Sequence, residues 1–149
     1  MHDDADARRQ AFDVAGRALT RRDHSVAQLR ERLLKTADAE VGEAVIADLE
    51  RIGYLDDERL ALALAERRLD AGWGPARVEA DLAALQIVSP AAMSLAEELA
   101  APAAKALLQS RHAVGKSLSR RYALLARRGF SEELCVGLLD PRVGCEVHD

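Results

Sequence analysis

Signals that begin or end an α-helix recur along this chain at short intervals. They combine glycine, proline or a capping serine with apolar stretches on either side, as at Ser25, Gly53, Gly74-Pro75, Ser89-Pro90 and Gly129. A serine oxygen accepts hydrogen bonds from the first N–H groups of a helix, proline fits the first turn, and glycine takes the left-handed conformation in which many helices end. The chain is therefore limited to short helices, of about 10 to 16 residues each.

The composition favours helices over strands. The 149 residues include 29 Ala and 22 Leu but only 13 Val and Ile together. Ala and Leu lose little conformational entropy in a helix, whereas β-branched side chains suit pleated sheets. We therefore predict an all-α protein, and this composition disfavours a sheet-based enzyme fold.

The start and stop signals predict nine helices. The first covers about residues 5 to 21, and later ones begin near Asp56 and Pro102. The nine helices group into triplets with a period of about 50 residues, which is typical of a helical repeat protein. The expected divisions are repeat 1 at 1–54, repeat 2 at 55–101, repeat 3 at 102–140 and a C-terminal tail at 141–149.

The sequence contains no recognisable catalytic, metal-binding or nucleotide-binding constellation. The histidines are scattered without the spacing of metal ligands. The segment 114–117 ends like a phosphate-binding loop, but Ser110 stands where that loop requires glycine. Asp23, His24 and Ser25 are consecutive and cannot converge as a triad, so Ser25 is interpreted as a helix cap. We expect no catalysis, no cofactor and no metal.

The N-terminus and the cysteines indicate a cytoplasmic protein. The acidic first residues are not followed by the apolar core of a secretory signal. The longest uncharged run, residues 82–96, is shorter than the roughly 20 apolar residues of a membrane span. Cys135 and Cys145 lack metal-ligand spacing, so we expect reduced thiols; a local disulfide between them stays open.

Charge is distributed unevenly along the chain. The formal net charge is −4, but residues 1–50 carry −3, residues 51–100 carry −4 and residues 101–149 carry +3. No carboxylate occurs between Leu99 and Ser131. On a helical wheel of this region, Leu118, Tyr122 and Leu125 form an expected buried face. Opposite and beside that face lies a group of cations that we call the basic ridge: Lys116, Arg120, Arg121, Arg127 and Arg128.

The basic ridge predicts an anionic partner, either nucleic acid or an acidic protein surface. The alternative is an ordinary solvated helix face, although such faces usually mix charges of both signs. Arg111 precedes the ridge, and Arg21 and Arg22 belong to a smaller basic group near the N-terminus. Trp73, the only tryptophan, lies between two glycines in an expected turn, where it either folds onto its own module or anchors a partner.

Four segments form a characteristic series along the chain: Leu19-Thr20-Arg21-Arg22-Asp23-His24-Ser25, Gly53-Tyr54-Leu55-Asp56-Asp57, Gly74-Pro75 with Arg77-Val78, and Ala126-Arg127-Arg128-Gly129-Phe130-Ser131. Together these segments resemble the RecX family of bacterial regulators of the RecA recombinase. The matches follow the family's order over residues 15 to 140. Residues 86–88 depart from the family pattern, which usually has Lys-Gly before the aliphatic residue.

The resemblance implies tandem three-helix repeats that form an elongated curved array. It also implies a non-enzymatic monomer that binds the groove of the RecA–single-strand DNA filament, limits filament growth and lowers RecA's ATPase and strand-exchange activity. Contact with single- or double-stranded DNA itself would be weaker. The alternative is a stand-alone helical DNA-binding regulator that uses the basic third repeat.

The expected partner-binding residues are the basic ridge together with Arg111, Arg21, Arg22, Trp73 and Arg77. The residues of the family signature that we expect to be mainly structural are Gly53, Tyr54, Leu55, Asp56 and Asp57.

Overall fold

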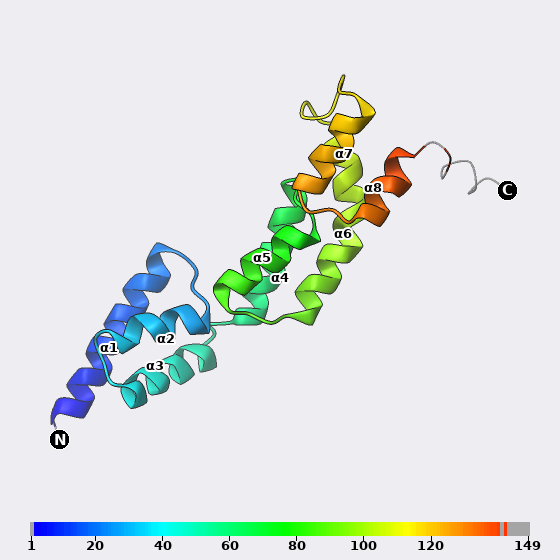
Figure 1. Cartoon of the computed structure of the whole chain (residues 1–149). Helices are drawn as coiled ribbons and strands as arrows, with labels where there is room; N and C mark the ends of the chain where they lie inside the picture. Colours follow the sequence, from blue (N-terminus) through cyan, green and yellow to red (C-terminus); the bar gives the residue numbers. More distant parts are fainter. Residues whose placement is uncertain (1, 141, 143–149) are drawn as a thin grey trace. The chain divides into compact units, whose positions relative to one another are not determined.

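Every regular element of the described residues is an α-helix (Figure 1). The structure, a computed structural model, describes residues 2–140 and 142. The helices are α1 (His2–Arg21), α2 (Val26–Leu34), α3 (Ala39–Arg51), α4 (Asp57–Asp70), α5 (Pro75–Leu85), α6 (Pro90–Leu108), α7 (Leu118–Arg127) and α8 (Glu132–Leu139). The prediction of an all-α protein is confirmed. Most of the expected tail, including Cys145, lies outside the described residues.

Capping side chains begin the helices where the sequence indicated. The Ser25 hydroxyl accepts a hydrogen bond from the Gln28 N–H at 3.1 Å, and the Gln28 side chain accepts one from the Ser25 N–H at 3.2 Å. This reciprocal capping box begins α2. Asp56 accepts from the Arg59 N–H at 3.0 Å to begin α4, and Ser89 accepts from the Ala92 N–H at 3.1 Å to begin α6.

The expected helix start at Pro102 is wrong, and the described residues form eight helices in place of nine. Helix α6 is continuous from Pro90 to Leu108, with Pro102 inside it. An interior proline removes one helical hydrogen bond and costs about 3 kcal/mol. The buried face nevertheless continues on both sides of the proline, through Ala96, Ala100, Ala104 and Leu107. Burial of this uninterrupted stripe outweighs the local loss.

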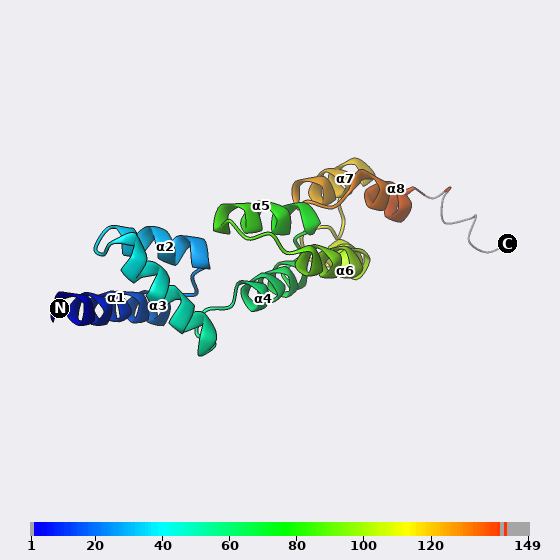
Figure 2. The same cartoon turned by 90° about the horizontal axis from the view of Figure 1, so that it is seen from below.

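The chain divides into two compact units, which we describe separately. Unit 1 comprises Met1–Leu60 and Ala83–Val88, and unit 2 comprises Ala61–Leu82 and Ser89–Asp149. In unit 1, α1, α2 and α3 lie side by side in both views (Figures 1 and 2). Their core is aliphatic, with Leu29, Leu33 and Val45 fully buried. The division into three repeats stays a prediction, and α6 runs across its expected boundary at residues 101 and 102.

The family-like segment at residues 53–57 forms the turn between α3 and α4 in unit 1. Gly53 ends α3 with φ +86, Leu55 is buried, and Tyr54 is 68% exposed. Asp57 accepts a hydrogen bond at 2.9 Å from the N–H of Val26, the first residue of α2. Asp57 therefore joins the starts of two helices, in addition to its place in the first turn of α4.

In unit 2, the α4–α5 turn and the α7–α8 turn meet through their backbones. The Gly74 N–H donates to the Arg128 carbonyl at 2.7 Å, and the Ala76 N–H donates to the Gly129 carbonyl at 3.1 Å. A Cβ atom at Gly74 would overlap the backbone of Gly129 and would lie 2.7 Å from the Phe130 nitrogen. Only glycine permits this approach, which fixes the two turns against each other.

Candidate partner-binding surface

Three cations of the basic ridge are exposed on α7 and on the loop before it. Lys116, Arg120 and Arg127 are all exposed. Ser117 caps α7 by accepting from the Arg120 N–H at 3.3 Å, and Arg127 lies two turns further along the same side. Among the described residues, no ion pair involves these three side chains. They present uncompensated positive charge to solvent.

The predicted buried face of α7 is partly wrong. Leu125 is buried and Tyr122 is half-buried, but Leu118 is 57% exposed, and Leu124 is buried in its place. A helical wheel treats every turn as equally covered, whereas the first turn of α7 is uncovered. Leu118 and the exposed Val114 therefore lie in the same stretch of chain as the exposed cations.

The remaining two residues of the ridge, Arg121 and Arg128, are partly buried. The Nε atom of Arg121 is buried and has no hydrogen-bond partner in the described part of the chain. Arg128 is half-buried, and its guanidinium lies over the Trp73 ring at 4.6 Å from the ring centroid. Its Nη1 atom also lies within 3.5 Å of the Ala71 carbonyl oxygen, to which it donates.

Trp73 packs within unit 2, where a second arginine also contacts its ring. The Arg77 guanidinium also lies over the ring at 4.6 Å from its centroid. Each such cation–π contact contributes roughly 0.5 to 2 kcal/mol, with the larger value in partly desolvated sites. We call Trp73, Arg77 and Arg128 the arginine–tryptophan cluster. Arg77, Arg128 and Trp73 were all expected to bind a partner, and in the structure the two arginines contact the tryptophan ring.

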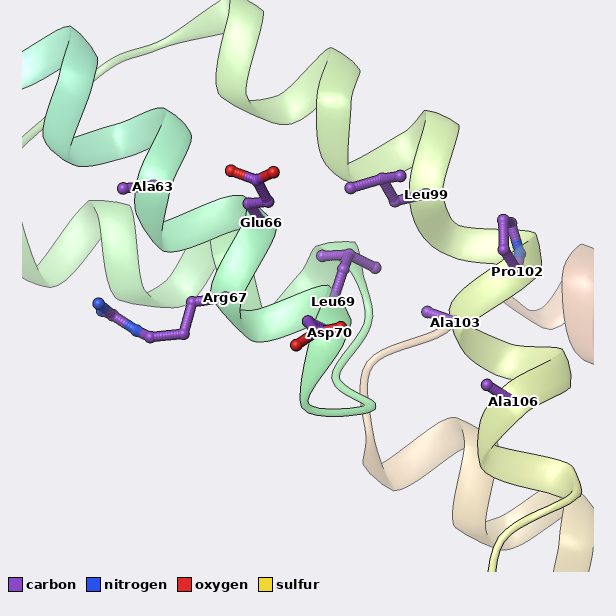
Figure 3. A pocket seen from close by; sticks show the side chains of 9 residues that line it. All are labelled: Ala63, Glu66, Arg67, Leu69, Asp70, Leu99, Pro102, Ala103 and Ala106. Atoms are coloured by element: carbon purple, nitrogen blue, oxygen red, sulfur yellow. The ribbon is translucent and has the colours of Figure 1, made fainter.

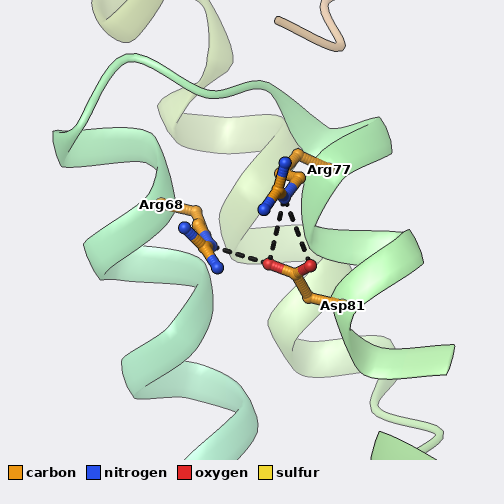
Figure 4. A network of polar contacts seen from close by, with 3 residues as sticks. All are labelled: Arg68, Arg77 and Asp81. Carbon is orange, nitrogen blue, oxygen red and sulfur yellow. Dashed lines mark hydrogen bonds and ion pairs between the residues drawn. The ribbon is translucent and has the colours of Figure 1, made fainter. Parts of the chain in front are cut away.

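A carboxylate between α4 and α5 pairs with two arginines at the edge of this cluster (Figure 4). Asp81 accepts from the Arg68 Nε at 2.6 Å through Oδ2, and from the Arg77 Nε at 3.2 Å through Oδ1. Arg77 and Asp81 are four residues apart on α5, a spacing at which side chains meet on a helix. Arg68 comes from α4, and sequence reasoning missed it.

The smaller basic group lies in unit 1. Arg21 ends α1 and Arg22 follows it, and both side chains are exposed. Arg30, on α2 in the same unit, is instead paired with Glu43, and its hydrogen bond lowers the pKa of the Glu43 carboxyl. Arg111 is exposed in the loop before α7, in unit 2.

An open groove of about 740 Å³ lies between α4 and α6 in unit 2 (Figure 3). Its walls are mostly apolar, with Leu69 and Leu99 pointing into the space between the helices. Its charged lining residues, Glu66, Arg67 and Asp70, all come from α4. The lining includes no histidine, cysteine, serine or threonine.

Among residues 2–140 and Arg142, no group of three or more His, Cys, Asp or Glu side chains is placed to hold a metal ion. No described helix combines the length and the hydrophobicity needed to cross a bilayer. Cys135 is a free, buried thiol.

The fold defines an all-α protein built from short capped helices, and unit 2 exposes cations that form no ion pair among the described residues. Regulatory protein RecX of Stenotrophomonas maltophilia strain K279a is 35% identical to the chain over 121 residues, which cover 75% of the chain and 74% of that protein. The chain therefore belongs to the RecX family, as its motifs predicted. No family model matches the sequence.

Further relatives and solved structures agree with this assignment. Regulatory protein RecX of Escherichia coli O7:K1 is 37% identical over 91 residues, so the match spans 51% of the chain and about half, 55%, of that relative's length. The crystal structure of RecX from Lactobacillus salivarius superposes with a TM-score of 0.71 at 14% identity, over 95% of this chain and 99% of that one. A second crystal structure, of regulatory protein RecX, superposes with a TM-score of 0.69 at 19% identity, over 91% of this chain and 73% of that one. At such identities the likeness concerns the fold.

Proposed function

We propose that this protein is a negative regulator of RecA, which binds in the groove of the RecA–single-strand DNA filament, limits its growth and inhibits ATP hydrolysis and strand exchange. Membership of the RecX family supports the regulatory role. The observation that carries the proposed contact is the exposed, unpaired positive charge of Lys116, Arg120 and Arg127. The protein acts as a cytoplasmic monomer without catalysis of its own.

A nucleoprotein filament suits such a surface because it repeats the same anionic features many times. Exposed cations without local carboxylate partners attract an anionic surface over about a Debye length, roughly 8 Å at physiological salt. Unit 1 adds Arg21 and Arg22 on the same chain. Two weak contacts on one chain raise the overall affinity, because the second contact forms at a high effective concentration.

Filament assembly on labelled single-stranded DNA tests the proposal. We expect fluorescence anisotropy, which rises as RecA coats the DNA, to rise less when this protein is present at substoichiometric amounts relative to RecA. An unchanged extent of assembly over a wide range of concentrations would contradict a regulatory role.

The second candidate is a stand-alone DNA-binding regulator, which the carboxylate-free stretch around α7 also favours. It requires tight binding to DNA without RecA, with an affinity that falls steeply with salt as counterions are released. Weak DNA binding in the absence of RecA, combined with inhibition of assembly in its presence, favours the RecA-directed function.

A further inference from the structure

Two guanidiniums lie over Trp73, and one of them shares a carboxylate with a third arginine. Arg68, Arg77 and Arg128 come from α4, α5 and the end of α7, and Asp81 is the only carboxylate with which any of them forms an ion pair among the described residues. Like charges held together in a partly desolvated place repel one another. The group is therefore stabilised by any anion that enters it.

The arginines are held in position before any ligand arrives. The Arg77 and Arg128 guanidinium carbons each lie 4.6 Å from the Trp73 centroid, so they lie within twice that distance of each other. The Gly74–Gly129 backbone contact fixes the turns that carry them. Asp81 engages the Nε atoms of Arg68 and Arg77. The Arg68 and Arg77 side chains remain 31% and 39% exposed, and their hydrogen bonds among the described residues are all made through Nε.

We propose that Arg68, Arg77 and Arg128, held by Trp73 and Asp81, form a binding site for a phosphate group of a nucleic-acid backbone. Planar guanidinium groups donate paired hydrogen bonds to phosphate, and several of them can share its oxygens. Guanidiniums from different helices can approach a tetrahedral phosphate from different directions, whereas a carboxylate presents both of its oxygens in one plane. Prior positioning lowers the entropy cost of forming these bonds. The site is separate from the exposed cations of α7, and its role in regulation rests on the proposed function.

The single tryptophan makes the site observable in the full chain. Trp73 emission should change on titration with oligothymidylate, and with inorganic phosphate at higher concentration, because an anion draws the guanidiniums away from the ring. Polyglutamate should have little effect. A response to inorganic phosphate equal to that of the oligonucleotide at matched phosphate concentration indicates a site for free phosphate and overturns the backbone assignment. A response to polyglutamate alone overturns the phosphate assignment.

Substitutions test the geometry. Arg77→Gln and Arg128→Gln should each lower the affinity for the oligonucleotide, measured by Trp73 emission, about tenfold. Each should also lower the slope of log affinity against log salt by about 0.7. Arg77→Lys should also bind several-fold more weakly, since lysine keeps the charge without the planar fork. Asp81→Asn keeps one side-chain oxygen that can accept from the arginines but removes the negative charge that opposes an anion, so it should bind roughly three- to tenfold more tightly. Arg51→Gln, in unit 1, is the matched control and should leave binding unchanged.

Circular dichroism establishes that each variant is folded. Weaker binding by Asp81→Asn, or unchanged binding by a folded Arg77→Gln, Arg128→Gln double variant, would overturn the site. None of these measurements contains RecA. Phosphate binding with no inhibition of RecA would therefore contradict the proposed function but support this site. Inhibition of RecA without a Trp73 response would overturn this site but support the proposed function.

Discussion

At the scale of single residues, Gly74 is a position where one added atom has a large consequence. Its missing Cβ leaves room for the backbone of Gly129 and Phe130. We expect Gly74→Ala to lower the free energy of unfolding of unit 2 by about 2 to 4 kcal/mol, because the neighbour that must move is backbone. Urea unfolding followed by Trp73 emission measures this change.

Gly137→Ala is the matched control. Gly137 lies within α8, and a Cβ there meets nothing within 4 Å. Alanine should therefore raise the free energy of unfolding by about 0.5 to 1 kcal/mol, since it restricts the unfolded chain and favours the helix. Equal effects of the two substitutions would contradict the close contact of the two turns.

The Cys135 thiol is expected to be unreactive in the folded protein. It is buried, and burial raises the pKa of this thiol. The thiolate is the reactive form, so labelling with a thiol reagent at pH 8 should be much slower than for a free cysteine, whose pKa is about 8.5. A Cys145→Ser variant leaves Cys135 as the only reporter. Labelling that is as fast in buffer as in urea would contradict this burial.

The same shift predicts how stability depends on pH. Where the pKa of a thiol is higher in the folded state, the unfolded chain releases its proton first as pH rises. Cys135 should therefore lower the free energy of unfolding progressively above about pH 8.5, and a Cys135→Ala variant should lose that part of the dependence. Denaturant titrations at pH 7 and pH 10 measure the difference.

Single residues were predictable from the sequence where their contacts are local. Ser25 and Asp56 cap helices through neighbours three residues away, and both were expected. The contact of Arg128 with Trp73 joins residues far apart in the chain, and no periodicity encodes it. The pairing of Arg77 with Asp81 had a usable signal in its spacing of four, whereas the pairing of Arg68 with Asp81 did not.

At the scale of elements, helix α6 shows where local signals fail. Pro102 is a strong start signal, yet α6 continues through it because the buried stripe is shared by both halves. Replacing it with alanine restores the missing N–H donor. We expect Pro102→Ala to raise the free energy of unfolding of unit 2 by about 1 to 3 kcal/mol, measured by urea unfolding. Pro102 is exposed. A lower free energy of unfolding in Pro102→Ala would contradict this expectation and indicate that the proline ring has a packing role.

Helix boundaries elsewhere followed their caps closely, because capping is determined by a few adjacent residues. The face that each helix buries was harder to predict. The wheel placed Leu118 in the core, but burial in a first turn depends on whether another element reaches it. Exposed Leu118 in turn changes the character of the surface beside Arg120, which is partly apolar as well as basic.

At the scale of the whole molecule, the overall charge conceals the feature that matters for binding. A net charge of −4 suggests repulsion from a nucleic-acid filament, whereas the last third of the chain carries +3. The sequence predicted this asymmetry, the all-α class and the family. It did not predict that two of the five ridge residues are partly buried, because that follows from tertiary contacts.

The exposed part of the ridge should therefore act in binding without contributing to folding. We expect Arg120→Glu with Arg127→Glu to leave the free energy of unfolding within about 0.5 kcal/mol of wild type, since both side chains are exposed and form no ion pair among the described residues. Arg9→Glu with Arg51→Glu, two exposed sites in unit 1, makes the same change in total charge. Loss of folding in the ridge variant alone would contradict this division of roles.

The central claim is tested most directly by the rate of ATP hydrolysis by RecA on single-stranded DNA. Added at substoichiometric amounts, the wild-type protein and the Arg9→Glu, Arg51→Glu variant should lower this rate to similar extents. The Arg120→Glu, Arg127→Glu variant should need at least about tenfold more protein for the same effect, the equivalent of about 1.4 kcal/mol of binding. A rate that stays constant with wild-type protein, or falls equally with all three proteins, would contradict regulation of RecA through the basic ridge.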